Sequence, residues 1–112
     1  MTVRILGAPQ RYVQGPGVID RLAEEVAIAG GGPVAVVIDP VARKLLGTRI
    51  LQQLPDARLL DFGGECTGAE IDACAAATGD ARLLLGVGGG KAIDTAKGAA
   101  IERGLPVGIV PT

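Results

Sequence analysis

Four glycines crowd positions 86–90 of the segment LLLGVGGGKAIDTAK, residues 83–97. The apolar run before these glycines predicts a buried strand, and the pattern from Lys91 onward predicts a helix. Each glycine in regular structure lowers stability by roughly 0.5–1 kcal/mol relative to alanine. A cluster of this density therefore requires a local reason. This strand, turn and helix therefore constrain the fold more than any other segment.

The turn has two physical explanations, which the segment alone leaves open. Backbone N–H groups of a glycine turn can surround a phosphate, and the helix that follows adds its positive end. Lys91 favours this explanation, because a cation in a first helical turn is unfavourable unless a negative group lies in front of it. The alternative is a turn selected for tight packing between strand and helix.

Neither standard phosphate-binding motif matches the turn. The P-loop would need glycine at Leu85 and Ser or Thr at Ala92. The dinucleotide fingerprint GxGxxG would need a third glycine at Lys91 or at Ile93. The sequence therefore predicts a phosphate-binding turn of another form.

The rest of the chain alternates between strand and helix patterns. An edge strand or extended arm is predicted around 11–14, and further strands at 34–39, 57–63, 82–87 and 106–110. Helices are predicted at 17–29, 41–54, from 67 onward and at 91–103. The second helix is expected to break near Gly47. Such alternation predicts an α/β fold of right-handed βαβ units with an open parallel sheet.

Local signals place the starts of two helices. Asp39 before Pro40 is typical of an N-cap followed by proline at the first helical position. Thr67 and Glu70 have the spacing of a capping box. Ligands of parallel sheets bind at the carboxyl ends of the strands, where Asp39, Gly63–Glu65, Gly88–Lys91 and Thr112 are expected to meet.

Composition limits the possible functions. The 112 residues form one domain, 1–112, with a net charge of −1 and 2% aromatic residues, so neither a basic surface nor stacking platforms indicate a nucleic-acid partner. Neither a membrane-spanning run nor a signal peptide is recognisable, which predicts a cytoplasmic chain without a membrane partner. Without histidine, acid–base or metal chemistry needs other groups or another polypeptide.

Five motifs in order resemble glycerol dehydrogenases of the iron-containing alcohol dehydrogenase superfamily. They are RYVQGPGVIDRL (11–22), VVID (36–39), FGGECTGAEI (62–71), GVGGGKAIDTAK (86–97) and LPVGIVPT (105–112). The resemblance implies a Rossmann-like open parallel sheet with helices on both faces, lacking the family's C-terminal helical domain. It also implies NAD as cofactor, and a zinc or iron ion that the complete enzyme holds in that helical domain.

What the resemblance implies for activity is limited by the length of the chain. The chain stops at Thr112 inside the family's PTxxST segment, so we expect the NAD-binding portion of a metal-dependent polyol dehydrogenase, inactive alone. The complete enzyme would oxidise glycerol to dihydroxyacetone. A homo-oligomer or a complementing helical domain is expected as partner. The alternatives are a stand-alone nucleotide-binding module, an inactive remnant, or half of an enzyme such as glycerol-1-phosphate dehydrogenase completed by another chain.

The resemblance implies a role for seven cofactor-binding residues, and neither a catalytic residue nor a metal ligand within the chain. Gly88, Gly89, Gly90 and Lys91 match the loop that holds the pyrophosphate and the adjoining ribose. Thr112 matches the first threonine of a segment that contacts the cofactor.

Two acids have competing explanations. Asp39 matches the acid that binds the adenosine ribose and favours NAD over NADP. The alternative is a plain N-cap before Pro40, although one carboxylate can do both. Asp94 matches the motif acid near the nicotinamide end, or is an acid favoured in a first helical turn. Lys97 is expected to cover the helix surface or to pair with Asp94, and Glu65 to be a solvated acid of a turn.

Cysteine usage gives no catalytic candidate. Cys66 and Cys74 are eight residues apart, a spacing that matches neither a zinc nor a redox motif. Both are expected to be free thiols, and neither is a strong candidate for a nucleophile.

Overall fold

The computed structural model describes residues 2–6, 11–14 and 17–112, with side chains at 17 and 19–112. Its helices are a 3-10 turn Val18–Arg21 and α1 Leu22–Ile28, α2 Pro40–Gln53, α3 Gly68–Ala77 and α4 Gly90–Arg103. Its strands are β1 Thr2–Leu6, β2 Arg11–Gln14, β3 Val34–Ile38, β4 Arg58–Asp61, β5 Leu83–Gly88 and β6 Val107–Pro111.

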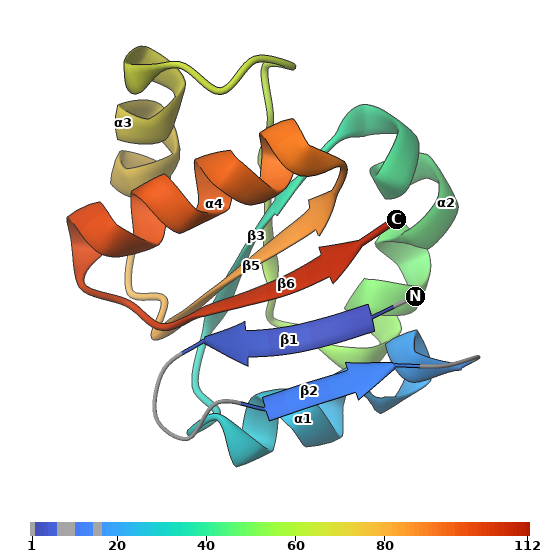
Figure 1. Cartoon of the computed structure of the whole chain (residues 1–112). Helices are drawn as coiled ribbons and strands as arrows, with labels where there is room; N and C mark the ends of the chain where they lie inside the picture. Colours follow the sequence, from blue (N-terminus) through green and yellow to red (C-terminus); the bar gives the residue numbers. More distant parts are fainter. Residues whose placement is uncertain (1, 7–10, 15–16) are drawn as a thin grey trace.

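One sheet with the order β2-β1-β6-β5-β3-β4 forms the centre of the molecule (Figure 1). Strands β6, β5, β3 and β4 are parallel, which confirms the predicted parallel sheet for these four strands. Strand β1 pairs antiparallel with both β6 and β2, so the N-terminal hairpin makes the complete sheet mixed. The edge strand predicted at 11–14 is β2, whereas β1 was not predicted.

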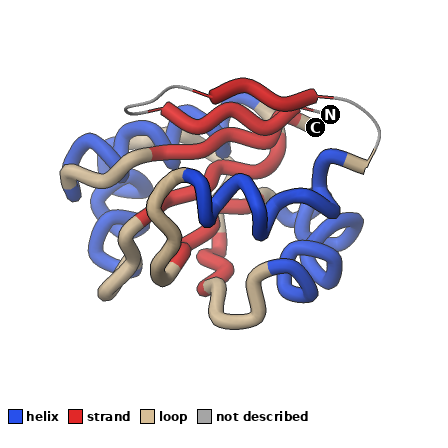
Figure 2. The backbone as a smooth tube through the Cα atoms, turned by 90° about the horizontal axis from the view of Figure 1, so that it is seen from below, coloured by secondary structure: helices blue, strands red, loops and turns tan. Residues whose placement is uncertain are grey.

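Helices cover both faces of the sheet, as predicted (Figure 2). Alternate residues of β3 separate the two cores: Val36 and Ile38 pack with α1 and α2, while Ala35 and Val37 pack with α3 and α4. All five residues of β3 are buried, which explains the continuous apolar run of this strand. Both cores are mainly aliphatic, and among the described side chains Phe62 is the one aromatic member of either.

Helix starts and stops follow local chemistry. The Asp39 carboxylate accepts from the Ala42 amide at 2.7 Å with Pro40 at the first helical position, and this confirms the predicted cap of α2. Thr67 Oγ1 accepts from the Glu70 amide at 3.1 Å at the start of α3. The Glu70 carboxylate does not complete the capping box in the expected way, because Oε1 accepts from the Gly63 amide at 2.9 Å.

Two helices differ from the sequence prediction. The expected break of α2 near Gly47 is wrong, since the helix runs without interruption from Pro40 to Gln53. Gly47 is buried there, and a Cβ would lie 3.8 Å from Leu59 Cδ1, so packing against β4 holds the helix across a residue of low helix propensity. The first predicted helix begins with the 3-10 turn, and three glycines with positive φ end it, Gly30–Gly32.

Candidate functional site

The candidate site lies where the order of the parallel strands reverses. After β3 the chain moves outward to β4, then returns to the other side of β3 to form β5. Ile38 and Val87 are register partners, so the residues that follow these strands, Asp39 and Gly88–Gly89, meet at the same edge. This is the carboxyl-end switch point at which open α/β sheets bind ligands.

Asp39 links the starts of two helices at this edge. Its Oδ1 accepts from the Ala42 amide at 2.7 Å in α2, and its Oδ2 accepts from the Gly89 amide at 3.2 Å just before α4. Its own backbone N–H donates to the Val87 carbonyl at 3.3 Å. The residue is therefore an N-cap, as expected, and also a structural link that sequence reasoning did not foresee.

Two glycines of the turn are required by packing. A Cβ on Gly86 would lie 2.7 Å from the Cβ of Ala96, so glycine here allows α4 to approach β5. Gly88 has φ +138°, and a Cβ there would lie 2.8 Å from Cγ of Asp39. The packing explanation for the turn is therefore correct for these two positions.

The next two glycines have open space in front of them. Gly89 has φ −82°, Gly90 is the first residue of α4, and a Cβ on either would meet nothing within 4 Å. Neither position has the positive φ that makes glycine necessary. The fold does not explain why these two residues lack a side chain, whereas close approach of a ligand would.

A pocket of about 310 Å³ lies at this place. Its lining residues are Asp39, Phe62, Gly64, Gly89, Gly90, Lys91 and Ala92. Four of them are among the seven predicted cofactor-binding residues, and Gly64 belongs to the segment Gly63–Glu65 that was expected at this edge, while Phe62 and Ala92 were missed. Phe62 follows the carboxyl end of β4, the position that could have indicated it from sequence.

Helix α4 directs its positive end into this pocket. Gly89, its N-cap, has no side chain to bond the first amides, and the Gly89 amide itself is bound by Asp39. The amides of Gly90, Lys91 and Ala92 have no acceptor within the helix, because helical acceptors begin with the Gly89 carbonyl, which accepts from Ile93. These amides are suited to bind an anion.

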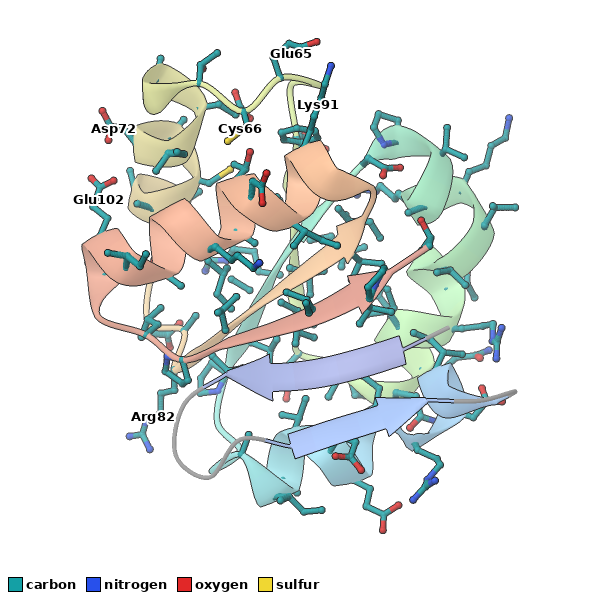
Figure 3. The ribbon with its side chains drawn as sticks, viewed as in Figure 1. Glu65, Cys66, Asp72, Arg82, Lys91 and Glu102 are labelled. Atoms are coloured by element: carbon teal, nitrogen blue, oxygen red, sulfur yellow. The ribbon has the colours of Figure 1, made fainter. Side chains whose placement is uncertain are left out.

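Lys91 has an acidic partner within the protein (Figure 3). Its Nζ lies 2.7 Å from Glu65 Oε1, in the connection between β4 and α3, and the two side chains point toward one another. Both are largely exposed, at 63% and 70%. Glu65 is therefore one negative group beside this cation, and the prediction of a solvated acid at Glu65 omitted its ion pair with Lys91.

Of the remaining predicted residues, Thr112 lies beside the turn, whereas Asp94 and Lys97 lie further along α4 and outside the pocket lining. The Thr112 amide donates to the Gly88 carbonyl at 3.1 Å, which places the C-terminal residue beside the turn. Asp94 is exposed and does not line the pocket, and as the fifth residue of α4 it lies beyond the first turn, contrary to its helix-dipole explanation. Lys97 is half-buried, and the ion pairs between described side chains do not include a pair with Asp94.

The residues present do not fit a metal. Within residues 2–6, 11–14 and 17–112, no group of three or more His, Cys, Asp and Glu residues is placed to hold an ion. Cys66 is exposed and Cys74 buried, both as free thiols. Burial raises the pKa of the Cys74 thiol to about 11, helped by the charge of Glu70, which disfavours a nucleophilic thiolate. In the described part of the chain, no helix is long and apolar enough to cross a membrane.

Comparison with known proteins assigns the class. Residues 9–112 match the family model of the iron-containing alcohol dehydrogenases. The chain belongs to this family.

Several similar relatives are glycerol dehydrogenases. The chain is 39% identical to glycerol dehydrogenase from Escherichia coli O6:H1 over 97% of its length, and 38% identical to that from Thermotoga maritima over 93%. It spans only 31% and 29% of these relatives.

Solved structures agree with the fold. A probable glycerol dehydrogenase from Sinorhizobium meliloti 1021 is 41% identical, with a TM-score of 0.72 over 85% of this chain and 26% of that one. Maleylacetate reductase from Agrobacterium tumefaciens gives a TM-score of 0.79 over 96% of this chain at 21% identity, a likeness of fold alone. The Rossmann-like α/β fold and the similarity to the N-terminal third of these enzymes are thus established.

Proposed function

We propose that this chain is the NAD-binding portion of a metal-dependent polyol dehydrogenase. The observation that carries the proposal is the open space in front of Gly89 and Gly90, at the start of α4 and beside the 310 Å³ pocket. A dinucleotide pyrophosphate would occupy that space and accept hydrogen bonds from the free amides of the first turn. When bound, NAD supplies a nicotinamide ring that accepts hydride.

Individual side chains have complementary roles in this proposal. Asp39 accepts from a ribose hydroxyl while it keeps its two backbone partners, because each carboxylate oxygen has two lone pairs. Its negative charge would disfavour the 2′-phosphate of NADP. Lys91 offsets part of the negative charge of the pyrophosphate. Gly88 adopts the positive φ of the turn, and Thr112 lies beside the turn. Asp94 is proposed at the nicotinamide end, outside the pocket lining.

The complete enzyme is proposed to oxidise glycerol to dihydroxyacetone, as the names of the relatives suggest. The described residues do not fit the zinc or iron that such chemistry uses, so the metal ligands would come from a further helical domain or a complementing chain. A homo-oligomer is also part of the proposal, as is a cytoplasmic location. Glycerol-1-phosphate dehydrogenase [NAD(P)+] from Haloquadratum walsbyi is 35% identical over 109 residues, which makes a phosphorylated substrate the second candidate.

Calorimetric titration with NAD tests the proposal in a matched pair of variants. Gly90 and Gly68 are both first residues of a helix with nothing within 4 Å of a Cβ, but only Gly90 lines the pocket. Alanine at either position should keep or raise stability, by up to about 1 kcal/mol. Gly90→Ala should weaken NAD binding about tenfold or more, and Gly68→Ala should leave it unchanged.

Three results would refute the binding role. They are a failure of the unmodified chain to bind NAD at millimolar concentration, an affinity for NAD that is unchanged in both variants, or the same loss of affinity in both. Turnover of glycerol by the purified chain with zinc would refute the expectation that this portion is inactive alone.

A further inference from the structure

The Glu65–Lys91 ion pair crosses the edge of the pocket. It joins two residues 26 positions apart, one in the turn after β4 and one in the first turn of α4 (Figure 3). Gly64 and Lys91 both line the pocket, and the side chain of Glu65, the neighbour of Gly64, connects them through its bond to Lys91. We call the connecting segment, residues 63–67, the Glu65 strap.

The strap is fixed at both ends and free at its tip. At one end the Gly63 amide donates to Glu70 Oε1 at 2.9 Å, and at the other Thr67 caps α3 by accepting from the Glu70 amide at 3.1 Å. Between them Gly64 turns the chain with φ +99°. The exposed Glu65 side chain therefore reaches Lys91 from a short, anchored turn and can leave it by rotation of its own side chain.

Charge at the pocket makes this contact consequential. Lys91 is the cation of the pocket lining and Asp39 its anion. With Glu65 paired to Lys91, these three side chains carry a net charge of −1. While the ion pair persists, a phosphate that approaches the free amides of α4 therefore meets side chains with a net negative charge. Once Glu65 withdraws, the charges of Lys91 and Asp39 cancel.

We propose that Glu65 is an internal competitor of the ligand's phosphate for Lys91, and that it must release this lysine before an anion is bound tightly. The proposal rests on the anion-binding role given above to the start of α4. An ion pair between two side chains this exposed contributes little to stability, so exchange for a phosphate is energetically small. The pyrophosphate of a dinucleotide carries two negative charges against one on Glu65, and it would also accept from the amides at the start of α4. Glu65 thus lowers the affinity of the site for weak anions and sets the charge a ligand must have.

Titration of the purified chain with inorganic pyrophosphate at low ionic strength tests the competition directly. Glu65→Gln should bind pyrophosphate about fivefold more tightly than the unmodified chain. Lys91→Gln should bind it more weakly, and adding Glu65→Gln to this variant should give no further gain, because the contested cation is gone.

Asp61→Asn is the matched control. Asp61 is also an exposed acid at the end of β4, paired with Arg43 at the same 2.7 Å, but neither residue lines the pocket. This variant should bind pyrophosphate within about twofold of the unmodified chain, since only the pocket's own pair competes.

The outcomes separate this proposal from the NAD-binding role. Equal or weaker pyrophosphate binding by Glu65→Gln, a matching gain in Asp61→Asn, or no binding by any variant would overturn the competition. If Glu65→Gln gains affinity for pyrophosphate while NAD does not bind, the competition stands and the dinucleotide assignment fails. If NAD binds the unmodified chain and Glu65→Gln equally, and pyrophosphate does also, the cofactor role stands and the competition fails.

Discussion

The Asp39 carboxylate accepts from the Gly89 amide at 3.2 Å across 50 residues of sequence. The same carboxylate caps α2 through the Ala42 amide at 2.7 Å. One side chain therefore sets the relative position of two helix starts at the ligand edge of the sheet. Sequence reasoning allowed this carboxylate to be both a cap and a ribose ligand, and the structure adds the bond to Gly89, which still leaves lone pairs for a ligand.

Replacement of Asp39 should affect stability more than loss of an ordinary cap. Asp39→Ala removes both bonds, and Thr67→Ala removes one cap bond at the start of α3. We expect Thr67→Ala to cost about 1 kcal/mol and Asp39→Ala about 1–2 kcal/mol, measured by urea unfolding. Equal costs would show that the link to Gly89 contributes nothing. Asp39→Asn should keep the cap of α2 and lose the bond to Gly89, because its side-chain NH2 cannot accept a hydrogen bond, and in a chain that binds NAD it should reduce the preference for NAD over NADP.

The two kinds of glycine in the turn should differ in their response to alanine. Gly88→Ala puts a Cβ in a backbone conformation with φ +138° and within 2.8 Å of Asp39 Cγ, so we expect a loss of about 2–4 kcal/mol. Gly89→Ala has φ −82° and open space, and should cost less than about 1 kcal/mol, chiefly because alanine is a poorer N-cap. Urea unfolding of both variants measures the difference. Similar losses would contradict the division of the turn into packing and ligand positions.

The periodicity of apolar residues predicted most of the fold, because the pattern of burial along the chain distinguishes strands from helices. The all-buried strands β3 and β5 read as continuous apolar runs, and the caps at Asp39 and Thr67 are local signals. Strand β1 escaped notice because its pairing with β6 joins residues about a hundred positions apart, which periodicity does not encode. Gly47 misled for a related reason, since tertiary packing outweighed its low helix propensity.

The sequence predicted where in the fold the candidate site lies more accurately than it predicted which residues contact one another there. Strand ends indicated Asp39 and the glycine turn, because parallel topology brings those ends together. The sequence could not divide Gly86 and Gly88 from Gly89 and Gly90, since that depends on what faces each Cα. The partner of Lys91 was likewise hidden, because Glu65 reaches it only through the arrangement of β4 beside β3.

The two thiols should react at very different rates. Cys66 is exposed, whereas Cys74 is 3% exposed and its pKa is raised from 9.0 to about 11, first by burial and then by the charge of Glu70. At pH 8 the disulfide reagent DTNB should label one thiol rapidly and the second only on unfolding. Cys66→Ser should abolish the rapid phase and Cys74→Ala should retain it. Rapid labelling of two thiols in the folded chain would contradict this assignment.

The raised pKa of Cys74 also has a consequence for stability. The folded state holds the thiol proton more tightly than the unfolded state does, so this contribution to stability is present below pH 9 and is lost as pH rises toward about 11. The unfolding midpoint in urea should therefore fall more steeply between pH 9 and 11 in the unmodified chain than in Cys74→Ala. Parallel pH profiles would contradict it.

Two carboxyl groups meet on the outer surface of α3 and α4, where Asp72 and Glu102 lie (Figure 3). A hydrogen bond to Asp72 raises the pKa of Glu102 above 4.5, with smaller contributions from partial desolvation and from the charge of Asp72. Both side chains are exposed, so solvent screens their interaction and its effect on stability is small. The folded state therefore binds this proton more tightly than the unfolded state. The contribution favours folding at low pH and is lost as pH rises through the raised pKa, because two ionised carboxylates then repel.

Glu102→Gln and Asp72→Asn should each remove this repulsion. We expect each variant to have a slightly higher Tm than the unmodified chain at pH 7, with a difference that shrinks as pH falls toward 4 and Glu102 takes up its proton. Because both substitutions act on the same interaction, the double variant should gain less than the sum of the two single gains. Additive gains, or gains that persist unchanged at pH 4, would mean that the two carboxyl groups do not interact and that α3 and α4 meet here without electrostatic cost.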